Sequence, residues 1–293
     1  MLSWQQALQQ APELACVSEM LNEVPLGALP VSGGLSNRGW RIASKTHGWV
    51  VYRGVGHHCQ AFDIDRQNER NVLQVLEQKV PCSTVIASGD SGLLVRWIDG
   101  QCLANKNALD ESDVFALAVL MAKTHRVEID RPIRAFNFTE KMDYYWSQIS
   151  SQEVKRRFRE VYQSYRATPN LLIQEHTLCH FDFGAHNIIV GEQAMSVIDW
   201  EYAALAPASL DLALTLSMLP ERQALFFQHY CRHQPQFSHS RLTQQQLEQD
   251  IITWRPYADA MAMLWYLVAA EVWDNPSFVA DADEARIRLE ANH

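Results

Sequence analysis

Hydrophobic and polar positions divide the chain into a first part rich in short strands and a second part rich in helices. Before residue 100, short β-type runs alternate with Gly-bearing turns, a pattern that predicts antiparallel hairpins. Two helices are also expected there, over residues 3–24, with Ser3 as the N-cap, and over residues 63–76. The strands are expected at residues 40–42, 49–53, 85–87 and 93–97.

From Asp110 onward, apolar side chains recur at helical spacing, and helices are expected to dominate. One β island, residues 178–199, interrupts them. The pattern changes most clearly near residue 100, which is the best candidate for a boundary between two units. We therefore expect a smaller β-sheet lobe over residues 1–99 and a larger, mainly helical lobe over residues 100–293.

The composition is that of a folded globular protein, with 47% hydrophobic and 20% charged residues among 293. The six cysteines are scattered without a CxxC pair, which is typical of reduced thiols in the cytoplasm. No signal pattern is present at the N-terminus, and the longest apolar run, residues 260–270, is about half of a bilayer span. We expect a cytoplasmic protein without a membrane partner, and the sequence does not indicate its oligomeric state.

The charge balance bears on the class of partner. The chain has 25 basic and 34 acidic side chains, which gives a net charge of −9. A protein that binds the nucleic-acid backbone needs a basic face, so this balance argues against a nucleic-acid partner. Nearly all of the negative charge follows residue 100, where it would attract a small cationic substrate. Acidity is also an ordinary solubility feature.

The β island carries the most informative polar residues. Its two predicted strands, residues 188–190 and 195–198, form a hairpin that brings Asn187 and Asp199 side by side. An amide oxygen and a carboxylate at one open end suit Mg²⁺. Asp182 precedes Asn187 by five residues, across a loop that can fold back to the same place. This is the equipment for metal-assisted phosphoryl transfer.

Other interpretations of these residues stay open. Isolated Asp and Asn residues usually cap turns, although the hairpin and the upstream His180 favour a functional site here. A metallohydrolase is one alternative from another class, and a nucleotide-binding protein without transfer activity is a second. The metallohydrolase would bind zinc or iron through His180, Asp182, His186 and Asp199.

A second polar pair is expected in the first lobe. Glu69 shares a helix face with Val72, Leu73 and Leu76, and a carboxylate on an apolar stripe is costly unless it is paired. Arg53, on a neighbouring strand, is its natural partner, and an arginine fixed in this way can present its other donors to a phosphate. A structural salt bridge or a solvent-facing Glu69 is the alternative.

Together these motifs resemble the aminoglycoside phosphotransferase and choline kinase superfamily, distant relatives of the protein kinases, and within it the choline and thiamine kinase-like branch. Each motif is weak alone, but the ordered set, centred on HxDxxxxN followed by IDWE, is specific and spans about residues 31–215. The matching motifs are Ser32–Arg38, Arg53, Arg66 with Glu69, Leu94–Gly100, Leu120–His125, His180–Asn187, Ile198–Glu201 and Leu210–Ala213.

The resemblance implies a two-lobed, protein-kinase-like α+β fold that binds ATP and Mg²⁺ in the cleft between the lobes. It implies that Asp182 orients the acceptor hydroxyl and takes its proton, that Asn187 and Asp199 hold Mg²⁺, and that Arg53, held by Glu69, contacts the phosphates. The other implied roles are backbone cover of the phosphates by Gly33, Gly34, Leu35, Ser36 and Asn37, contact with adenine by Trp97 and Ile98, and structural support by His180, Asp211 and His125.

Two positions depart from the family pattern. His186 stands where glycine usually precedes the metal-binding asparagine, and Phe181 stands where a small residue is common. Arg53 stands where the family often has lysine, but arginine occurs in this branch. If the backbone needs a positive φ at residue 186, histidine tolerates it better than most residues do. None of these changes removes a charged group that phosphoryl transfer needs.

Aromatic residues are dense over residues 254–273 and follow helical spacing, which is typical of core packing. The alternative is an aromatic pocket for a quaternary ammonium or thiazolium group. On that interpretation the substrate contacts are Trp254, Trp265, Glu271 and Trp273, with Glu201 as a further candidate that has an equally plausible structural role.

The sequence therefore predicts an ATP-dependent kinase that transfers the γ-phosphate to a hydroxyl of a small cationic metabolite, with choline or thiamine preferred. An aminoglycoside, another sugar or another alcohol is the alternative acceptor. Neither a GxxxxGK[ST] loop nor a GxGxxG turn between a strand and a helix is present, which argues against P-loop enzymes and dinucleotide oxidoreductases. The sequence does not decide between ATP and GTP.

Overall fold

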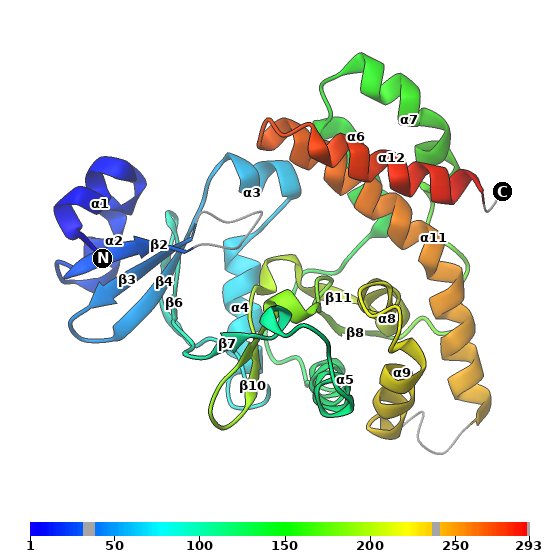
Figure 1. The fold of residues 1–293 in the computed structure, drawn as a ribbon, viewed down its shortest axis with the longest axis horizontal. Helices are drawn as coiled ribbons and strands as arrows, with labels where there is room; N and C mark the ends of the chain where they lie inside the picture. The colour runs from blue at the N-terminus through cyan, green and yellow to red at the C-terminus, as the bar shows by residue number, and fades with distance from the viewer. Residues whose placement is uncertain (32–38, 236–240, 292–293) are drawn as a thin grey trace.

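The computed structural model describes residues 1–31, 39–235 and 241–291, with the side chains of residues 241 and 242 left out. Figure 1 shows a smaller lobe built on a sheet, in blue and cyan, joined to a larger lobe in which helices predominate. The expected two-lobed α+β architecture is confirmed. The boundary after residue 99 stays a prediction.

The small lobe is built on one antiparallel sheet with the strand order β1-β2-β3-β4-β6-β5. At its centre is the predicted hairpin of β3 (Trp40–Ser44) and β4 (Gly48–Gly54), in which Ile42 lies opposite Val50. Gly48 adopts a φ of 71° where the turn enters β4, a conformation that glycine accepts without steric cost. The other strands are β1 (Leu2–Ser3), β2 (Gly27–Pro30), β5 (Val85–Gly89) and β6 (Gly92–Arg96).

The two faces of this sheet have different neighbours, because successive side chains on a strand point to opposite sides. Trp40, Ile42 and Val50 pack on one face, in an apolar cluster that includes the N-terminal helices. Val51 and Val95 are paired on the other face and line the cavity between the lobes. The sheet therefore supplies both a small core and one wall of that cavity.

The N-terminal region forms two helices, whereas one helix was expected over residues 3–24. α1 (Trp4–Gln10) begins with a capping box at Ser3, as its sequence predicts. It ends before Pro12, because proline has no N–H to donate and disfavours a helical conformation at the preceding residue. α2 (Ala15–Leu21) follows after a short 3-10 turn.

Two further helices follow β4. α4 (Arg66–Leu76) confirms the expected internal helix, with Asp65 as its N-cap. It begins three residues later than expected because Asp63 has a left-handed backbone conformation, with a φ of 56°. Asp63 is also the C-cap of α3 (His57–Phe62), a helix that the hydrophobic pattern did not predict.

The large lobe contains the helices expected after Asp110 and the short strands of the β island. Its helices are α5 (Glu111–His125), α6 (Phe138–Gln148), α7 (Gln152–Tyr165), α8 (Ala208–Ser217), α9 (Gln223–Arg232), α11 (Arg241–Val272) and α12 (Ser277–Glu290). Its strands are β7 (Gln101–Cys102), β8 (His176–Cys179), β9 (Ile188–Val190), β10 (Met195–Val197) and β11 (Ala204–Pro207). The 3-10 turns are η1 (Pro12–Leu14), η2 (Leu103–Asn105), η3 (Ala185–Asn187) and η4 (Trp200–Tyr202).

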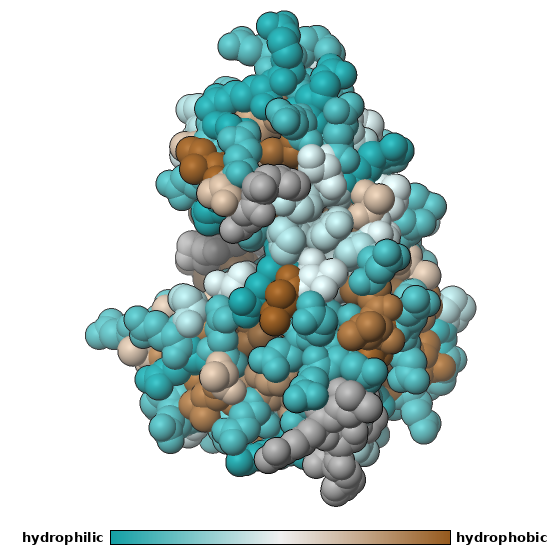
Figure 2. Space-filling model, turned by 90° about the vertical axis from the view of Figure 1, so that its right-hand side faces the viewer, coloured by the Kyte–Doolittle hydropathy of each residue, from teal (hydrophilic) through white to brown (hydrophobic). Residues whose placement is uncertain are grey.

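A single large apolar core joins α4 of the small lobe to the helices of the large lobe. Figure 2 shows that one outer face of the molecule is mostly hydrophilic, with small and separate hydrophobic patches. Over the part of the chain that the structure describes, we find no helix with the length and apolar character that a membrane span requires.

Trp254 belongs to this core. Its side chain is 1% exposed, and its ring centroid lies 5.2 Å from that of Phe138. Trp254 and Trp265 are both part of α11, and Trp273 directly follows its last residue, so the three rings project to different neighbours. The structure corrects the expectation that Trp254 contacts a substrate: it packs between helices, away from the cavity wall.

Replacing Trp254 tests this core position. We expect Trp254→Ala to lower the free energy of unfolding by about 3–5 kcal/mol, because a large buried ring leaves a cavity that the helices fill only in part. Urea unfolding followed by circular dichroism measures this loss. Leu172→Ala is the control, since Leu172 is 60% exposed and its loss should change the unfolding midpoint little. A loss below about 1 kcal/mol at Trp254 would contradict the buried position.

Candidate active site

A cavity of about 1220 Å³ lies between the lobes. Val51 and Arg53 of β4 line one part of it, the loop at Asp182 lines another, and Trp265 of α11 lines a third. Pockets for one drug-sized ligand usually occupy about 300–1,000 Å³, so this cavity has room for two small molecules. Its walls come from segments more than two hundred residues apart in the sequence.

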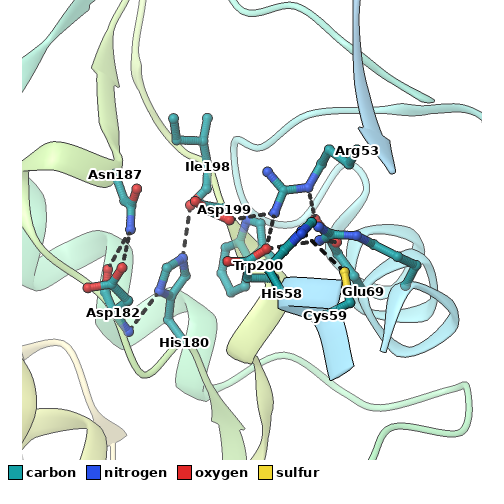
Figure 3. A network of polar contacts seen from close by, with 12 residues as sticks. Arg53, His58, Cys59, Glu69, His180, Asp182, Asn187, Ile198, Asp199 and Trp200 are labelled. Carbon is teal, nitrogen blue, oxygen red and sulfur yellow. Dashed lines mark hydrogen bonds and ion pairs between the residues drawn. The ribbon is translucent and has the colours of Figure 1, made fainter. Parts of the chain in front are cut away.

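The predicted catalytic hairpin is present. β9 and β10 pair with Ile188 opposite Val197, and the Ile198 N–H donates to the Asn187 carbonyl at 2.9 Å. The backbone of Asn187 therefore lies next to that of Ile198 and Asp199, at the open end of the hairpin, as expected (Figure 3). Asp199 has a φ of 65°, and this left-handed turn directs its carboxylate to Arg53 instead of along the strand.

Asp182 lies at the same place. The Asn187 amide nitrogen donates to the Asp182 carbonyl at 3.0 Å and to its carboxylate at 2.9 Å, so the loop between them folds back as predicted. This use of the amide nitrogen leaves the Asn187 side-chain oxygen for another partner. His186 Nε2 lies 3.0 Å from the other carboxylate oxygen of Asp182, and this hydrogen bond raises the pKa of His186 above its ordinary value.

Two buried residues support this loop. Asp211 accepts hydrogen bonds from the backbone N–H groups of His180 and Phe181, each at 2.8 Å. Its second oxygen also lies 3.0 Å from His125 Nε2. The expected structural roles of His180, Asp211 and His125 agree with these contacts. Burial by itself raises the pKa of Asp211, but the hydrogen bonds from His125 and from the His180 amide hold its pKa below the ordinary value.

Both ring nitrogens of His180 form hydrogen bonds with backbone groups. Nδ1 accepts from the Asp182 N–H at 3.2 Å, which places the ring proton on Nε2, 3.0 Å from the Ile198 carbonyl (Figure 3). Neither nitrogen is left for a metal ion, so the geometry disfavours the metallohydrolase alternative. The left-handed conformation of this loop falls on Phe181, with a φ of 69°, and not on His186, where the family pattern pointed.

Arg53 is the centre of a buried cluster of charges. Its Nε lies 2.6 Å from Glu69, and its Nη2 lies 2.5 Å from Asp199 and 2.9 Å from Glu201. The predicted pairing of Arg53 with Glu69 is confirmed. Burial lowers the pKa of Arg53, but the three carboxylates around it raise its pKa overall, so the guanidinium keeps its charge.

Arg66 completes the cluster. It lies 2.6 Å from Glu69 and 3.0 Å from Glu201, so each of these carboxylates contacts two guanidinium groups. Glu201 is almost fully buried at the cavity wall, and its two ion pairs agree with the structural role that the sequence left open. Sequence reasoning did not pair Glu201 with Arg66, because 135 residues separate them.

The part of the cavity next to the small lobe contains the other predicted nucleotide contacts. Trp97 and Ile98 follow β6 and line the cavity beside Val51 and Val95. The segment Gly33–Asn37, which is expected to cover the phosphates, lies outside the residues that the structure describes.

The opposite part of the cavity is aromatic. Its lining includes Trp265 and Tyr202, and the Trp265 Nε1–H donates to the Tyr202 hydroxyl at 3.0 Å. The Trp265 ring also packs on Phe62, with 5.2 Å between the centroids. The further aromatic residues of this part are Phe136, Tyr144, Tyr145, Phe181 and Tyr266.

Two of the predicted substrate contacts lie elsewhere. Trp273 packs on Phe62 and on Trp265, with centroid distances of 5.2 Å and 5.7 Å, but it does not line the cavity. Glu271 accepts the backbone N–H groups of Ser150 and Ser151 at the start of α7. Only Trp265 of the predicted α11 residues lines the cavity within the described ranges.

Asp63 is a charged residue of this region that the sequence did not single out. It contacts Lys141 at 2.6 Å and forms a second ion pair with Arg134. Burial raises the pKa of Asp63, but its hydrogen bonds to Arg134 and Lys141 lower its pKa further, so it is ionised. No pattern in the sequence points to this group, because Lys141 of α6 follows Asp63 by 78 residues.

A second cluster, His125, Cys179 and Asp211, has the residue types of a metal site, but its side chains are not available as metal ligands. The side-chain ligand atoms of His125, Cys179 and Asp211 lie within 4.8 Å of one another. His125 Nδ1 lies 2.8 Å from the Tyr230 hydroxyl, and burial raises the pKa of the Cys179 thiol well above its ordinary value. A protonated thiol and an engaged imidazole make this a hydrogen-bonded part of the core.

Comparison with known proteins identifies the family of the chain. The family model described as the phosphotransferase enzyme family matches residues 27–244. This match covers most of the chain, and the protein belongs to that family. No protein in the curated set matches the sequence at a significant level.

Solved structures of small-molecule kinases superpose on the whole chain. Choline kinase LicA from Streptococcus pneumoniae does so with a TM-score of 0.70 at 18% identity, over 94% of this chain and 98% of that one. An ethanolamine kinase from Plasmodium vivax gives 0.71 at 13%, over 97% and 88%. The GDP and kanamycin complex of APH(2″)-IIIa gives 0.63 at 14%, over 98% and 99%. At these identities the superpositions establish the fold alone, which this chain shares with those choline, ethanolamine and aminoglycoside kinases.

Asp211→Asn tests the support of the loop through its pH dependence. The pKa of Asp211 is lowered in the folded state, so its charge stabilises the fold above its ordinary pKa, and this stabilisation is lost as the pH falls through the folded value. We expect the wild type to be more stable than Asp211→Asn at neutral pH, and the difference to narrow below about pH 4.

Urea unfolding midpoints between pH 3 and pH 7 measure this difference. Asp90→Asn serves as the control, because Asp90 is exposed in the turn between β5 and β6 and should give no such trend. A difference that stays constant down to pH 3, or that grows on acidification, would show that the charge of Asp211 does not stabilise the fold.

Proposed function

We propose that this protein is an ATP-dependent kinase that transfers the γ-phosphate to the hydroxyl of a small cationic alcohol, with choline or thiamine as the preferred acceptors. One observation carries the proposal: Asp182, Asn187 and Asp199 meet at a cavity that has Arg53 on one side and aromatic rings on the other. The phosphotransferase family supports the reaction class.

The side-chain oxygens of Asn187 and Asp199 are the proposed Mg²⁺ ligands. They fit a hard cation, because both are oxygen donors at one open hairpin end and Asn187 turns its nitrogen away toward Asp182. Mg²⁺ bound there would neutralise charge on the ATP phosphates. Arg53 lies 2.5 Å from Asp199, so its guanidinium is placed to contact the same phosphates.

Asp182 is the proposed catalytic residue. Its carboxylate accepts a hydrogen bond from the acceptor hydroxyl and aims that oxygen at the γ-phosphorus. As the new O–P bond forms, the bond from the γ-phosphorus to the ADP oxygen breaks, and the hydroxyl proton passes to Asp182. A carboxylate is a weak base, so its positioning role outweighs proton removal in a loose transition state. Asn187 and His186 hold the carboxylate in orientation from two sides.

Charge and aromatic character support a cationic acceptor. Seven acidic side chains line the cavity, against four basic ones, and aromatic rings line the same cavity. Aromatic faces attract quaternary ammonium and similar cations. Solved structures with this fold include choline and ethanolamine kinases, as well as a gentamicin complex of APH(2″)-IIa. An aminoglycoside is therefore the alternative acceptor, and it belongs in the same test.

Turnover of ATP with a panel of acceptors tests the reaction. We expect choline or thiamine, with Mg²⁺, to stimulate ADP formation and to yield a phosphorylated product that mass spectrometry detects. Asp182→Asn should lower kcat by at least about a hundredfold, because it removes the group that orients the hydroxyl. The same variant should bind a non-hydrolysable ATP analogue as the wild type does.

Three results would contradict parts of this proposal. Phosphorylation of kanamycin alone would move the acceptor class to aminoglycosides. Tight ATP binding without product from any acceptor would favour a nucleotide-binding protein without transfer activity. Full activity of Asp182→Asn would exclude Asp182 as the catalytic residue.

Trp265 offers a separate test of the acceptor site, with Trp273 as a matched control. Both rings pack on Phe62, but only the Trp265 ring lines the cavity. We expect Trp265→Leu to raise the acceptor KM roughly three- to thirtyfold, which corresponds to a lost cation–π contact of about 0.5–2 kcal/mol. Trp273→Leu should cost similar stability without that change. Equal KM values for the two variants would argue against an acceptor contact at Trp265.

A further inference from the structure

Three residues form a stack at the edge of the cavity, and we name it the Trp–Arg stack. Arg41 of β3 lies with its guanidinium carbon 4.2 Å from the ring centroid of Trp49 and 4.2 Å from that of Trp97. Trp49 belongs to β4 and Trp97 directly follows β6, so the stack crosses adjacent strands of the small-lobe sheet.

The stack lies on the face of the sheet that looks into the cavity. Arg41 is paired with Val51, and Val51 with Val95, and paired residues of antiparallel strands share a face. Trp49 precedes Val51 by two residues and Trp97 follows Val95 by two, so both rings share that face as well. Trp97 itself lines the cavity.

The Trp–Arg stack and the proposed phosphate site lie at opposite ends of β4. Trp49 and Arg53 are on the same strand four residues apart, a distance of about 13 Å at ~3.3 Å per residue. Arg53 contacts Asp199 at the proposed phosphate site, whereas the Arg41 guanidinium packs between Trp49 and Trp97, toward the other end of β4. A nucleotide with its phosphates at Arg53 extends its base toward Trp97.

Trp97 is held by three contacts. Its ring packs on the Arg41 guanidinium, its Nε1–H donates to Asp99 at 2.9 Å, and its backbone N–H donates to the Trp49 carbonyl at 3.0 Å. Asp99 also lies 3.6 Å from Arg41, which fixes the guanidinium relative to the indole. Because a planar guanidinium packs on aromatic rings better than an ammonium group does, arginine suits this position.

We propose that Arg41 is a positioning residue, which holds Trp97, the expected adenine contact, in the orientation in which the nucleotide base packs on it. This inference rests on the proposed nucleotide site in the cleft. Holding the indole in place before the ligand arrives lowers the entropy cost of binding, so the stack raises the affinity for the base and not for the phosphates. A base packed on an aromatic ring contributes through its π face.

Calorimetric titration in the presence of Mg²⁺ separates the base from the phosphates. The probes are a non-hydrolysable ATP analogue and inorganic tripolyphosphate, which has no base. We expect Arg41→Met to weaken binding of the ATP analogue about tenfold, or about 1.4 kcal/mol, and to leave tripolyphosphate binding within about twofold. In steady-state assays the same variant should raise the ATP KM while kcat stays unchanged.

Further variants control for charge and for folding. Lys45→Met removes one positive charge from the exposed turn of the same hairpin and should bind both probes as the wild type does. Arg41→Lys keeps the charge without the planar group and should not restore full affinity. Asp99→Asn weakens the hold on the Trp97 indole at an 88% exposed side chain, which spares the fold, and should weaken analogue binding about threefold.

The outcomes distinguish this inference from the proposed function. Unchanged analogue binding by Arg41→Met and Asp99→Asn would overturn the role of the stack while leaving the kinase assignment intact. Equal losses for the ATP analogue and tripolyphosphate would also overturn it, because they would indicate general damage to the lobe. A wild type that binds neither probe would overturn the proposed nucleotide site itself.

Discussion

The buried ion pairs around Arg53 are the interaction on which the cleft depends. A buried charge is costly unless it is paired, and removing one partner of such a pair leaves an uncompensated charge. Here Glu69 and Glu201 each contact Arg53 and Arg66, and Asp199 adds a third carboxylate to Arg53. The cluster joins β4, α4 and the turn after β10, so it fixes the small lobe against the catalytic hairpin.

A second group of buried contacts, made by Asp211 and His180, holds the catalytic loop in place. Asp211 on α8 accepts two consecutive backbone N–H groups, and the His180 ring links the Asp182 N–H to the Ile198 carbonyl. These contacts stabilise the left-handed conformation at Phe181, which a bulky residue rarely adopts. The loop geometry is therefore set by buried polar groups that never need to touch a ligand.

The cavity between the lobes has two walls of different character. The sheet face with Val51 and Trp97 forms one wall, and the aromatic group around Trp265 forms the opposite one. Asp182 lies between these walls, on the loop that the Arg53 cluster and the contacts of Asp211 and His180 hold in place. This arrangement accounts for how one cavity can serve a nucleotide and a small acceptor at the same time, with the reacting groups held at their meeting point.

Residues close in sequence were predicted well. The hairpin of β9 and β10, the placement of Asn187 beside Asp199 and the fold-back to Asp182 all follow from spacing within some twenty residues. The Arg53–Glu69 pair also followed, because a carboxylate on an apolar helix face requires a partner. The proline that ends α1 was visible in the sequence as well, although the expected helix ran through it.

What the sequence by itself determined was the order of elements and the chemistry of the catalytic motif, since both arise from local periodicity and short spacing. Only the tertiary structure decided that Glu201 joins the arginine cluster and that Trp265, but neither Trp254 nor Trp273, reaches the cavity. Trp254 and Trp265 are on α11 and Trp273 directly follows it, and the direction each ring faces depends on how this segment packs against α3 and α6. Packing between distant segments has no signature in the spacing of residues along one helix.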